Sequence, residues 1–107
     1  MNKDEFDKKV HELFSEYHKL INTRNEVLTS NNGIFSRYKY PILTRHHAPV
    51  FWIYDLNYNT NPNLIQRLGI NTTFNAGAIE LNKKYYIVAR VEGFDVKSFF
   101  AVAESTD

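Results

Sequence analysis

The sequence contains no cysteine, which excludes a disulfide framework, a thiol nucleophile and a cysteine-based zinc site. It also lacks an excess of charge of either sign, because 13 Lys and Arg face 12 Asp and Glu, for a net charge of +1. Such a balance gives no global field that would recruit nucleic acid or an anionic membrane. We therefore expect no nucleic-acid partner and no membrane partner, and the missing cysteine fits a reducing cytoplasm.

Long hydrophobic runs and common catalytic motifs are absent as well. No stretch approaches the roughly 18 consecutive apolar residues that span a bilayer, and the polar, acidic N-terminus lacks the apolar centre of a signal peptide. The dinucleotide, P-loop, serine-hydrolase and zincin motifs do not occur. These absences favour a small cytoplasmic protein outside those enzyme classes.

The N-terminal region predicts an amphipathic helix. Apolar residues recur there at steps of three and four, at Phe6, Val10, Leu13, Phe14, Tyr17, Leu20 and Ile21. Asn2 and Glu5 resemble a capping box, and a helix start at Asp4 fits equally well. The apolar stripe needs a partner surface, and homo-oligomerisation through the helix stays open. Because Asn31-Asn32-Gly33 signals a turn, we place a first region of helix and loop at 1–30.

The next part of the chain predicts β-structure and one further helix. Arg37 to Tyr40 and Val50 to Tyr54 are rich in aromatic and β-branched residues and predict strands. The stretch between Pro41 and Pro49 predicts an irregular or edge segment. A two-turn helix is expected after it, with Asn61 as cap, Pro62 at its first position, Leu64, Ile65 and Leu68 at helical spacing, and Gly69 as a left-handed stop.

The last third predicts an antiparallel meander of three strands. Ala78 to Leu81 and Lys84 to Val91 flank the turn Asn82-Lys83, and Ser98 to Ala103 follows a second turn at 93–95. Strand alternation divides the middle strand into two faces, one with Tyr86, Val88, Arg90 and Glu92 and the other with Tyr85, Ile87, Ala89 and Val91. The predicted class is mainly β with an N-terminal α-helix.

Charged residues of this meander are the candidate ligand-binding groups. Arg90 and Glu92 share a strand face and could bind a polyhydroxylated or anionic ligand; the pattern by itself favours a surface ion pair. Asp95 and Lys97 flank the following turn and either extend this polar set or only solubilise the turn.

Histidines and aromatic residues offer weaker candidates. His46-His47 does not predict a metal site, because neighbours on an extended segment point apart and no further ligand stands at a suitable spacing. Tyr38, Tyr40, Phe51, Trp52, Tyr54 and Tyr58 interleave with basic residues. These residues either stack on sugars or bases, or belong to the hydrophobic core while the tyrosine hydroxyl groups stay in contact with water. We favour the second interpretation.

Several strings taken together carry a resemblance to a known family. They are Arg37-Tyr38-Lys39-Tyr40-Pro41-Ile42-Leu43-Thr44, Pro49-Val50-Phe51-Trp52, Tyr54-Asp55-Leu56-Asn57, Asn75-Ala76-Gly77-Ala78, Ala89-Arg90-Val91-Glu92-Gly93, and the run from Lys97 to Ser105. Their order and spacing resemble the N-terminal portion of the inverting β-mannoside phosphorylases of glycoside hydrolase family 130, in particular the branch that acts on 4-O-β-D-mannosyl-D-glucose.

The resemblance implies a fold and a reaction. The family folds as a five-bladed β-propeller, and since a blade takes ~40 to 50 residues, 31–107 would be the first part of such a catalytic domain, about one blade, truncated at the C-terminus. The implied reaction is phosphorolysis of a β-mannoside with inversion, giving α-mannose 1-phosphate and glucose. Inorganic phosphate is then the co-substrate, no cofactor is needed, and the segment alone is expected to be inactive.

The resemblance also implies roles for particular residues. Asn75 and Arg90 match the family's mannose-binding pair, Glu92 is a second candidate on the same strand face, and Asp95 and Lys97 are carried over with them. No residue of this segment matches the catalytic acid. Val96 departs from the family, which commonly carries a basic residue in this turn. The rival hypothesis is a stand-alone β-rich carbohydrate-binding module that uses Trp52 and the tyrosines.

Overall fold

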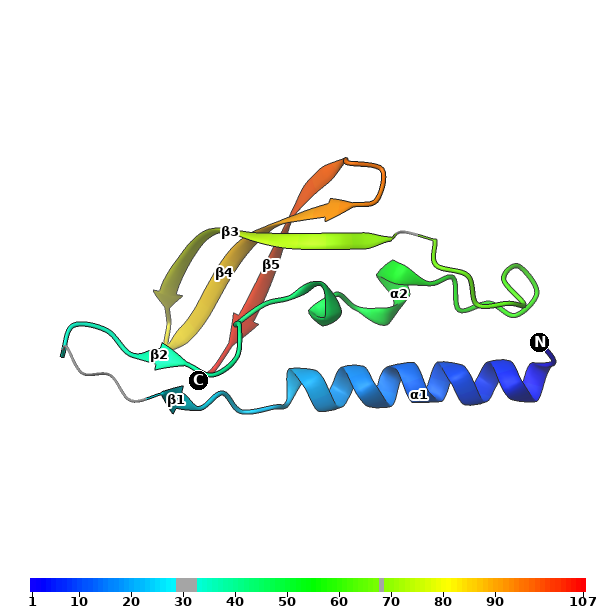
Figure 1. The fold of residues 1–107 in the computed structure, drawn as a ribbon, viewed down its shortest axis with the longest axis horizontal. Coiled ribbons are helices and arrows are strands. Elements are labelled where there is room, and N and C mark those ends of the chain that lie inside the picture. Colours follow the sequence, from blue (N-terminus) through cyan, green and yellow to red (C-terminus); the bar gives the residue numbers. More distant parts are fainter. Residues whose placement is uncertain (29–32, 68) are drawn as a thin grey trace.

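A long N-terminal helix, α1 (Lys3–Ile21), runs along one side of the chain (Figure 1). The computed structural model describes residues 1–28, 33–67 and 69–107, except for the side chains of Asn75 and Ala76. The Asn2 side chain accepts the Glu5 backbone N–H (2.8 Å), and the Glu5 carboxylate accepts the Asn2 N–H (3.2 Å). The predicted capping box is therefore formed, and the helix begins at Lys3. No helix in these described ranges has the length and apolar character needed to cross a bilayer.

The apolar side of α1 is packed against the rest of the chain, as its periodicity predicts. Phe6 is 2% exposed, and its ring meets the Tyr58 ring edge-on, with 5.4 Å between centroids. Farther along the helix, Val10, Leu13, Phe14, Tyr17 and Leu20 are half-buried, whereas Ile21 is exposed. The predicted amphipathic helix is confirmed.

A two-stranded ribbon follows the helix. β1 (Val27–Leu28) pairs antiparallel with β2 (Arg37–Tyr38), and the Asn25 side chain extends the pairing by bonding both the carbonyl (2.8 Å) and the N–H (3.1 Å) of Tyr40. β2 lies within the predicted strand Arg37 to Tyr40, and β1 was not predicted. At the predicted turn, Asn31 and Asn32 lie outside the described residues, and Gly33 has a left-handed φ of 66°.

The predicted strand from Val50 to Tyr54 is wrong. Residues Val50–Ile53 form a single helical turn, α2, in which the N–H of Trp52 donates to the carbonyl of Pro49 (2.9 Å). β-propensity expresses how a side chain packs more than a backbone preference, and here the turn buries Val50 and sets Trp52 edge-on to Phe99. Before it, the expected irregular stretch contains one turn of 3₁₀ helix, η1 (Arg45–His47).

The predicted helix beginning at Asn61 is also wrong. The Asn61 side chain accepts the N–H of Ile65 and donates to its carbonyl (2.9 Å each), and Leu64 is left-handed, with φ of 50°. This side-chain bonding replaces helical backbone bonds, which is the known competition from asparagine. Leu68 lies outside the described residues.

Gly69 is not the predicted left-handed stop, because Gly33 is the one described glycine with positive φ. A Cβ on Gly69 would lie 1.6 Å from an atom of the Phe94 ring, so close approach explains this glycine.

The C-terminal half is a three-stranded antiparallel sheet in the order β3-β4-β5, formed by β3 (Ile70–Leu81), β4 (Lys84–Gly93) and β5 (Ser98–Ser105). Asn82 and Lys83 join the first two strands with left-handed φ values of 52° and 62°, as a two-residue hairpin of this twist requires. The predicted meander is confirmed, although β3 begins well before Ala78. A bulge interrupts the β3–β4 register between Asn75 and Gly77.

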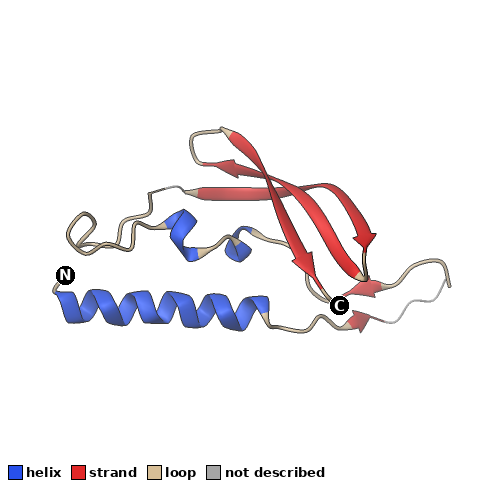
Figure 2. Cartoon of the chain, turned by 180° about the vertical axis from the view of Figure 1, so that it is seen from behind, coloured by secondary structure: helices blue, strands red, loops and turns tan. Residues whose placement is uncertain are grey.

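The two faces of the sheet have different environments. The inner face carries the buried residues Ala89 and Val91 and lies against α2 and η1, which in turn contact α1 (Figure 2). The outer face exposes six large apolar residues, Phe74, Ile79, Leu81, Val88, Phe100 and Val102. The solvent-accessible surface of the chain is 8410 Å², whereas a compact monomer of the same mass exposes about 6,200 Å². The excess surface fits sheets that are open at their edges and on the outer face.

The architecture is mainly β with an N-terminal helix and open sheets.

Candidate functional site

Two of the predicted site residues lie on the outer face of the middle strand. Arg90 stands opposite Phe74 of β3 on one side and Phe100 of β5 on the other. Glu92 stands between Thr72 and Ser98, and it is half-buried whereas Arg90 is exposed. Because directly opposite residues of antiparallel strands share a face, this end of the outer face presents the Arg90 guanidinium and the Glu92 carboxylate among aromatic and hydroxyl side chains.

Arg90 and Glu92 do not form the surface ion pair that their spacing favours. In the described ranges, no carboxylate lies within 4.0 Å of the Arg90 guanidinium, and the ion pairs that do form involve lysines. The guanidinium carbon instead lies 4.6 Å from the centroid of the Phe74 ring, which is a cation–π contact. The hydrogen-bonding edge of Arg90 therefore remains available for a ligand.

Asp95 and Lys97 belong to the turn between β4 and β5. The Asp95 carboxylate accepts the backbone N–H of Lys97 (3.1 Å), and the Lys97 carbonyl accepts the N–H of Gly93 (3.0 Å). Val96 between them has φ of 65°, which is rare for a β-branched residue. Both charged side chains are exposed, and the bonds of Asp95 organise the turn.

Asn75 is placed only by its backbone. It pairs with Ala89 immediately before the β3 bulge, one residue after Phe74. This register position is that of Ala89 on the inner face, not that of Arg90. The Asn75 side chain lies outside the described part of the structure, so its expected place beside Arg90 stays a prediction.

The His47 side chain bonds back to Thr44, the N-cap residue of the 3₁₀ turn. Its Nδ1 accepts the backbone N–H of Thr44 (3.0 Å) and lies 2.9 Å from the Thr44 hydroxyl oxygen. Burial lowers the pKa of His47 below its usual value, and the charge of the neighbouring His46 acts in the same direction. The folded chain therefore favours the neutral ring, the form whose Nδ1 can accept from Thr44.

Acidification should weaken the fold through His47. The pKa of His47 is lower in the folded chain than in the unfolded chain, where it is near 6.5. The stability that follows from this difference is fully present above pH 6.5 and is lost as the pH falls through the folded pKa. We expect the midpoint of urea unfolding to drop between pH 7.5 and 5, and His47→Asn to flatten that drop. His46→Asn removes an exposed imidazole whose charge is the smallest of the causes that act on the His47 pKa, and it should leave most of the drop in place. An equal slope in both variants would contradict the assignment.

Two further kinds of site can be considered from the sequence, a metal site at His46-His47 and a stacking surface made of aromatic residues. In the described part of the chain, no three His, Asp or Glu side chains lie where they could hold a metal ion together. The aromatic residues disperse: Tyr58 donates to the Met1 carbonyl (3.0 Å) at the start of α1, whereas Tyr38 lies in the ribbon beyond its end (Figure 1). Trp52 packs against Phe99, so no single aromatic platform results.

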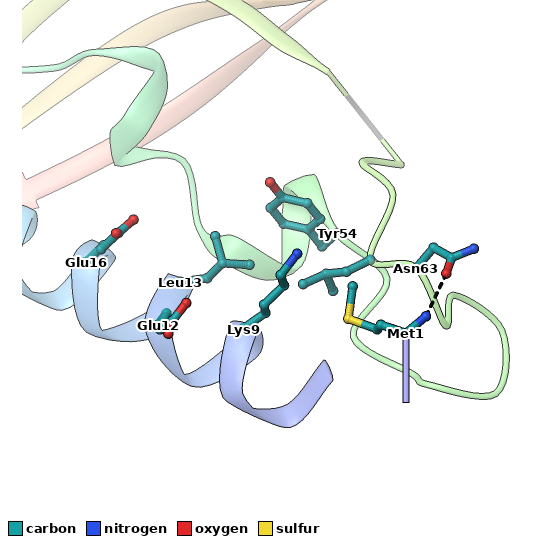
Figure 3. Close-up of a pocket in the computed structure, with 8 residues that line it drawn as sticks. Met1, Lys9, Glu12, Leu13, Glu16, Tyr54 and Asn63 are labelled. Atoms are coloured by element: carbon teal, nitrogen blue, oxygen red, sulfur yellow. Dashed lines mark hydrogen bonds between the residues drawn. The ribbon is translucent and has the colours of Figure 1, made fainter. Parts of the chain in front are cut away.

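A cleft that the sequence did not predict lies between α1 and the loop after α2 (Figure 3). Its volume is about 310 Å³, and its walls are Met1, Lys9, Glu12, Leu13, Glu16, Tyr54, Asn63 and Leu64. The Met1 ammonium donates to the Asn63 side-chain oxygen (3.0 Å). No residue of β3, β4 or β5 lines this cleft, which is therefore separate from the Arg90 site.

Comparison with known proteins gives one informative relative. No protein-family profile matches the chain. Over 100 residues, however, it is 53% identical to 4-O-β-D-mannosyl-D-glucose phosphorylase of Bacteroides fragilis, an enzyme. The match covers 94% of this chain and 26% of that protein, so the chain spans about a quarter of the relative's length. The resemblance predicted from the sequence strings is confirmed: this chain is a homologue of part of a mannosyl-glucose phosphorylase.

Proposed function

We propose that this chain is part of a β-mannoside phosphorylase of glycoside hydrolase family 130, acting on 4-O-β-D-mannosyl-D-glucose or a related β-mannoside. The observation that carries the proposal is the 53% identity over 100 residues to the Bacteroides fragilis enzyme. In this proposal the meander is one blade of a five-bladed propeller, the protein works in the cytoplasm without a cofactor, and the 107-residue chain alone is inactive.

The proposed chemistry needs one protein carboxyl group and inorganic phosphate. Phosphate attacks the anomeric carbon from the face opposite the leaving oxygen, and the bond to glucose breaks as that oxygen gains a proton. The products are α-mannose 1-phosphate and glucose. Since phosphate is already a nucleophile, no base is needed to activate water. We assign the proton donor to no residue of this chain.

Within this chemistry, the chain contributes to sugar binding. Arg90 presents N–H donors from a rigid central strand, and Glu92 presents acceptors two residues away on the same face. Asn75 completes the proposed mannose subsite, with Asp95 and Lys97 at its margin. A strand paired on both sides fixes its side chains more precisely than a loop does.

A chimaera tests this function directly. The 100 matched residues of this chain replace their counterparts in the Bacteroides fragilis phosphorylase, and mannose 1-phosphate release from 4-O-β-D-mannosyl-D-glucose is measured with and without phosphate. We expect phosphate-dependent activity. A well-folded chimaera without it would contradict the proposal, and activity of the isolated 107-residue chain would contradict the expected inactivity.

Arg90→Ala in the active chimaera should lower kcat/KM by about tenfold or more, because charge-assisted hydrogen bonds contribute about 1.5 to 3 kcal/mol each. Lys84→Ala, at an exposed ion pair on the same strand, is the matched control and should leave kcat/KM unchanged. Phosphorolysis within twofold of the parent after Arg90→Ala would remove Arg90 from the subsite.

A further inference from the structure

The contact between Phe74 and Arg90 is arranged as a support for the guanidinium. The two residues are directly opposite each other on β3 and β4, and the guanidinium carbon lies 4.6 Å from the ring centroid. Phe74 is itself 44% exposed, so its ring is not buried as core. The ring lies at the surface and contacts the side chain of Arg90 on the neighbouring strand β4 (strands in Figure 1).

The geometry leaves the donors of Arg90 unused. The five N–H groups of a guanidinium lie in its plane, and a phenyl ring offers them no oxygen or nitrogen acceptor, so the contact with Phe74 uses none of them in a conventional hydrogen bond. In the described ranges, neither a carboxylate within 4.0 Å nor a hydrogen-bond acceptor engages that edge. The ring restricts the orientation of the cation while the edge stays free for ligand oxygens.

We propose that Phe74 is a positioning residue, which holds the Arg90 guanidinium ready to bind the oxygens of the substrate. This inference rests on the proposed function of Arg90 and goes beyond it by adding a residue that acts only through Arg90. Ordering a long side chain before the ligand arrives removes an entropic cost from binding. Phe74 does not touch the reacting atoms.

A double-mutant cycle in the active chimaera tests this role. Phe74→Leu should lower kcat/KM by about two- to tenfold, the range expected for one freed side chain, and Phe74→Tyr should keep it within twofold of the parent. In the Arg90→Ala background, Phe74→Leu should have no further effect. Phe100→Leu is the matched control, because Phe100 flanks Arg90 from β5 and has an exposed ring; we expect kcat/KM within twofold of the parent.

Chemical rescue gives a second measurement that a merely structural role would not change. Free guanidinium chloride should restore part of the activity of Arg90→Ala while the Phe74 ring is present, and should fail once Phe74→Leu is added. Equal losses from Phe74→Leu with and without Arg90 would overturn the positioning role and leave the proposed function standing. Full activity of Arg90→Ala would instead remove the subsite itself.

The 12.6 kDa chain also permits a readout without activity. The ring current of Phe74 should shift the side-chain proton resonances of Arg90 upfield in the NMR spectrum. This shift should persist in Phe74→Tyr and disappear in Phe74→Leu. Arg90 resonances at ordinary positions in the parent would overturn the proposal even if no chimaera could be produced.

Discussion

Ala89→Asp is expected to unfold the chain, whereas Val88→Asp, one residue earlier on the same strand, should leave it folded. Ala89 is 1% exposed on the inner face of β4, where a carboxylate would be buried without a partner. That penalty is about several kcal/mol, comparable with the total stability of a small domain, about 5 to 15 kcal/mol. Val88 is 38% exposed on the outer face, where water solvates the new charge.

Circular dichroism and urea unfolding of the two variants measure this difference. Both substitutions add the same negative charge and lower strand propensity, so the comparison isolates the face of the sheet. Equal destabilisation of the two would contradict the assignment of Ala89 and Val91 to the packed face.

Phe6→Ala should have the second-largest effect, a loss of about 3 to 5 kcal/mol in the free energy of unfolding. The ring is 2% exposed and is the largest fully buried side chain among the described residues. Its removal leaves a cavity beside Tyr58 and weakens the attachment of α1 to the loop after α2, which carries Tyr58. Urea unfolding followed by Trp52 fluorescence and by helical circular dichroism measures the loss.

Phe100→Ala is the control for that loss, because the same side chain is 71% exposed on the outer face. We expect a change of at most about 0.5 kcal/mol, as for other surface substitutions. If Phe6→Ala costs no more than Phe100→Ala, the N-terminal helix is not held by its apolar stripe.

The elements predicted correctly from sequence are those whose signals are local. The spacing of Phe6, Val10 and Leu13 defines a helix face within one segment, and Asn82-Lys83 defines a hairpin within one turn. Strand alternation likewise separates Ala89 from Arg90 without knowledge of the partner strands. In each case the deciding interactions lie a few residues apart.

The incorrect predictions involve contacts that sequence spacing does not contain. Residues 50–53 have strand propensity, yet packing of Trp52 on Phe99, far along the chain, accompanies a helical turn. Asn61 was predicted as a helix cap, and its side chain instead closes a loop by bonding Asp55 and Ile65.

For the same reason, the sequence predicted the shared face of Arg90 and Glu92 but not the position of Phe74. Alternation placed Arg90 and Glu92 on one face, but the β3 register that sets Phe74 opposite Arg90 depends on the bulge after Asn75. Bulges leave little signal in a single sequence beyond a glycine such as Gly77. The support of Arg90 by an aromatic ring became visible only with the strand pairing.

The two tight connections of the sheet have a consequence for the order of folding. β3 pairs with β4, and β4 with β5, so every strand meets its neighbour in the sequence, and contacts such as Ile79 with Tyr86 close short loops. The contacts that fasten α1 instead join Met1 to Tyr58 and Asn63, across separations of 57 and 62 residues. Since long loop closure costs more entropy and slows folding, we expect the meander to assemble first and α1 to dock afterwards onto α2, η1 and the loop that carries Tyr58 and Asn63.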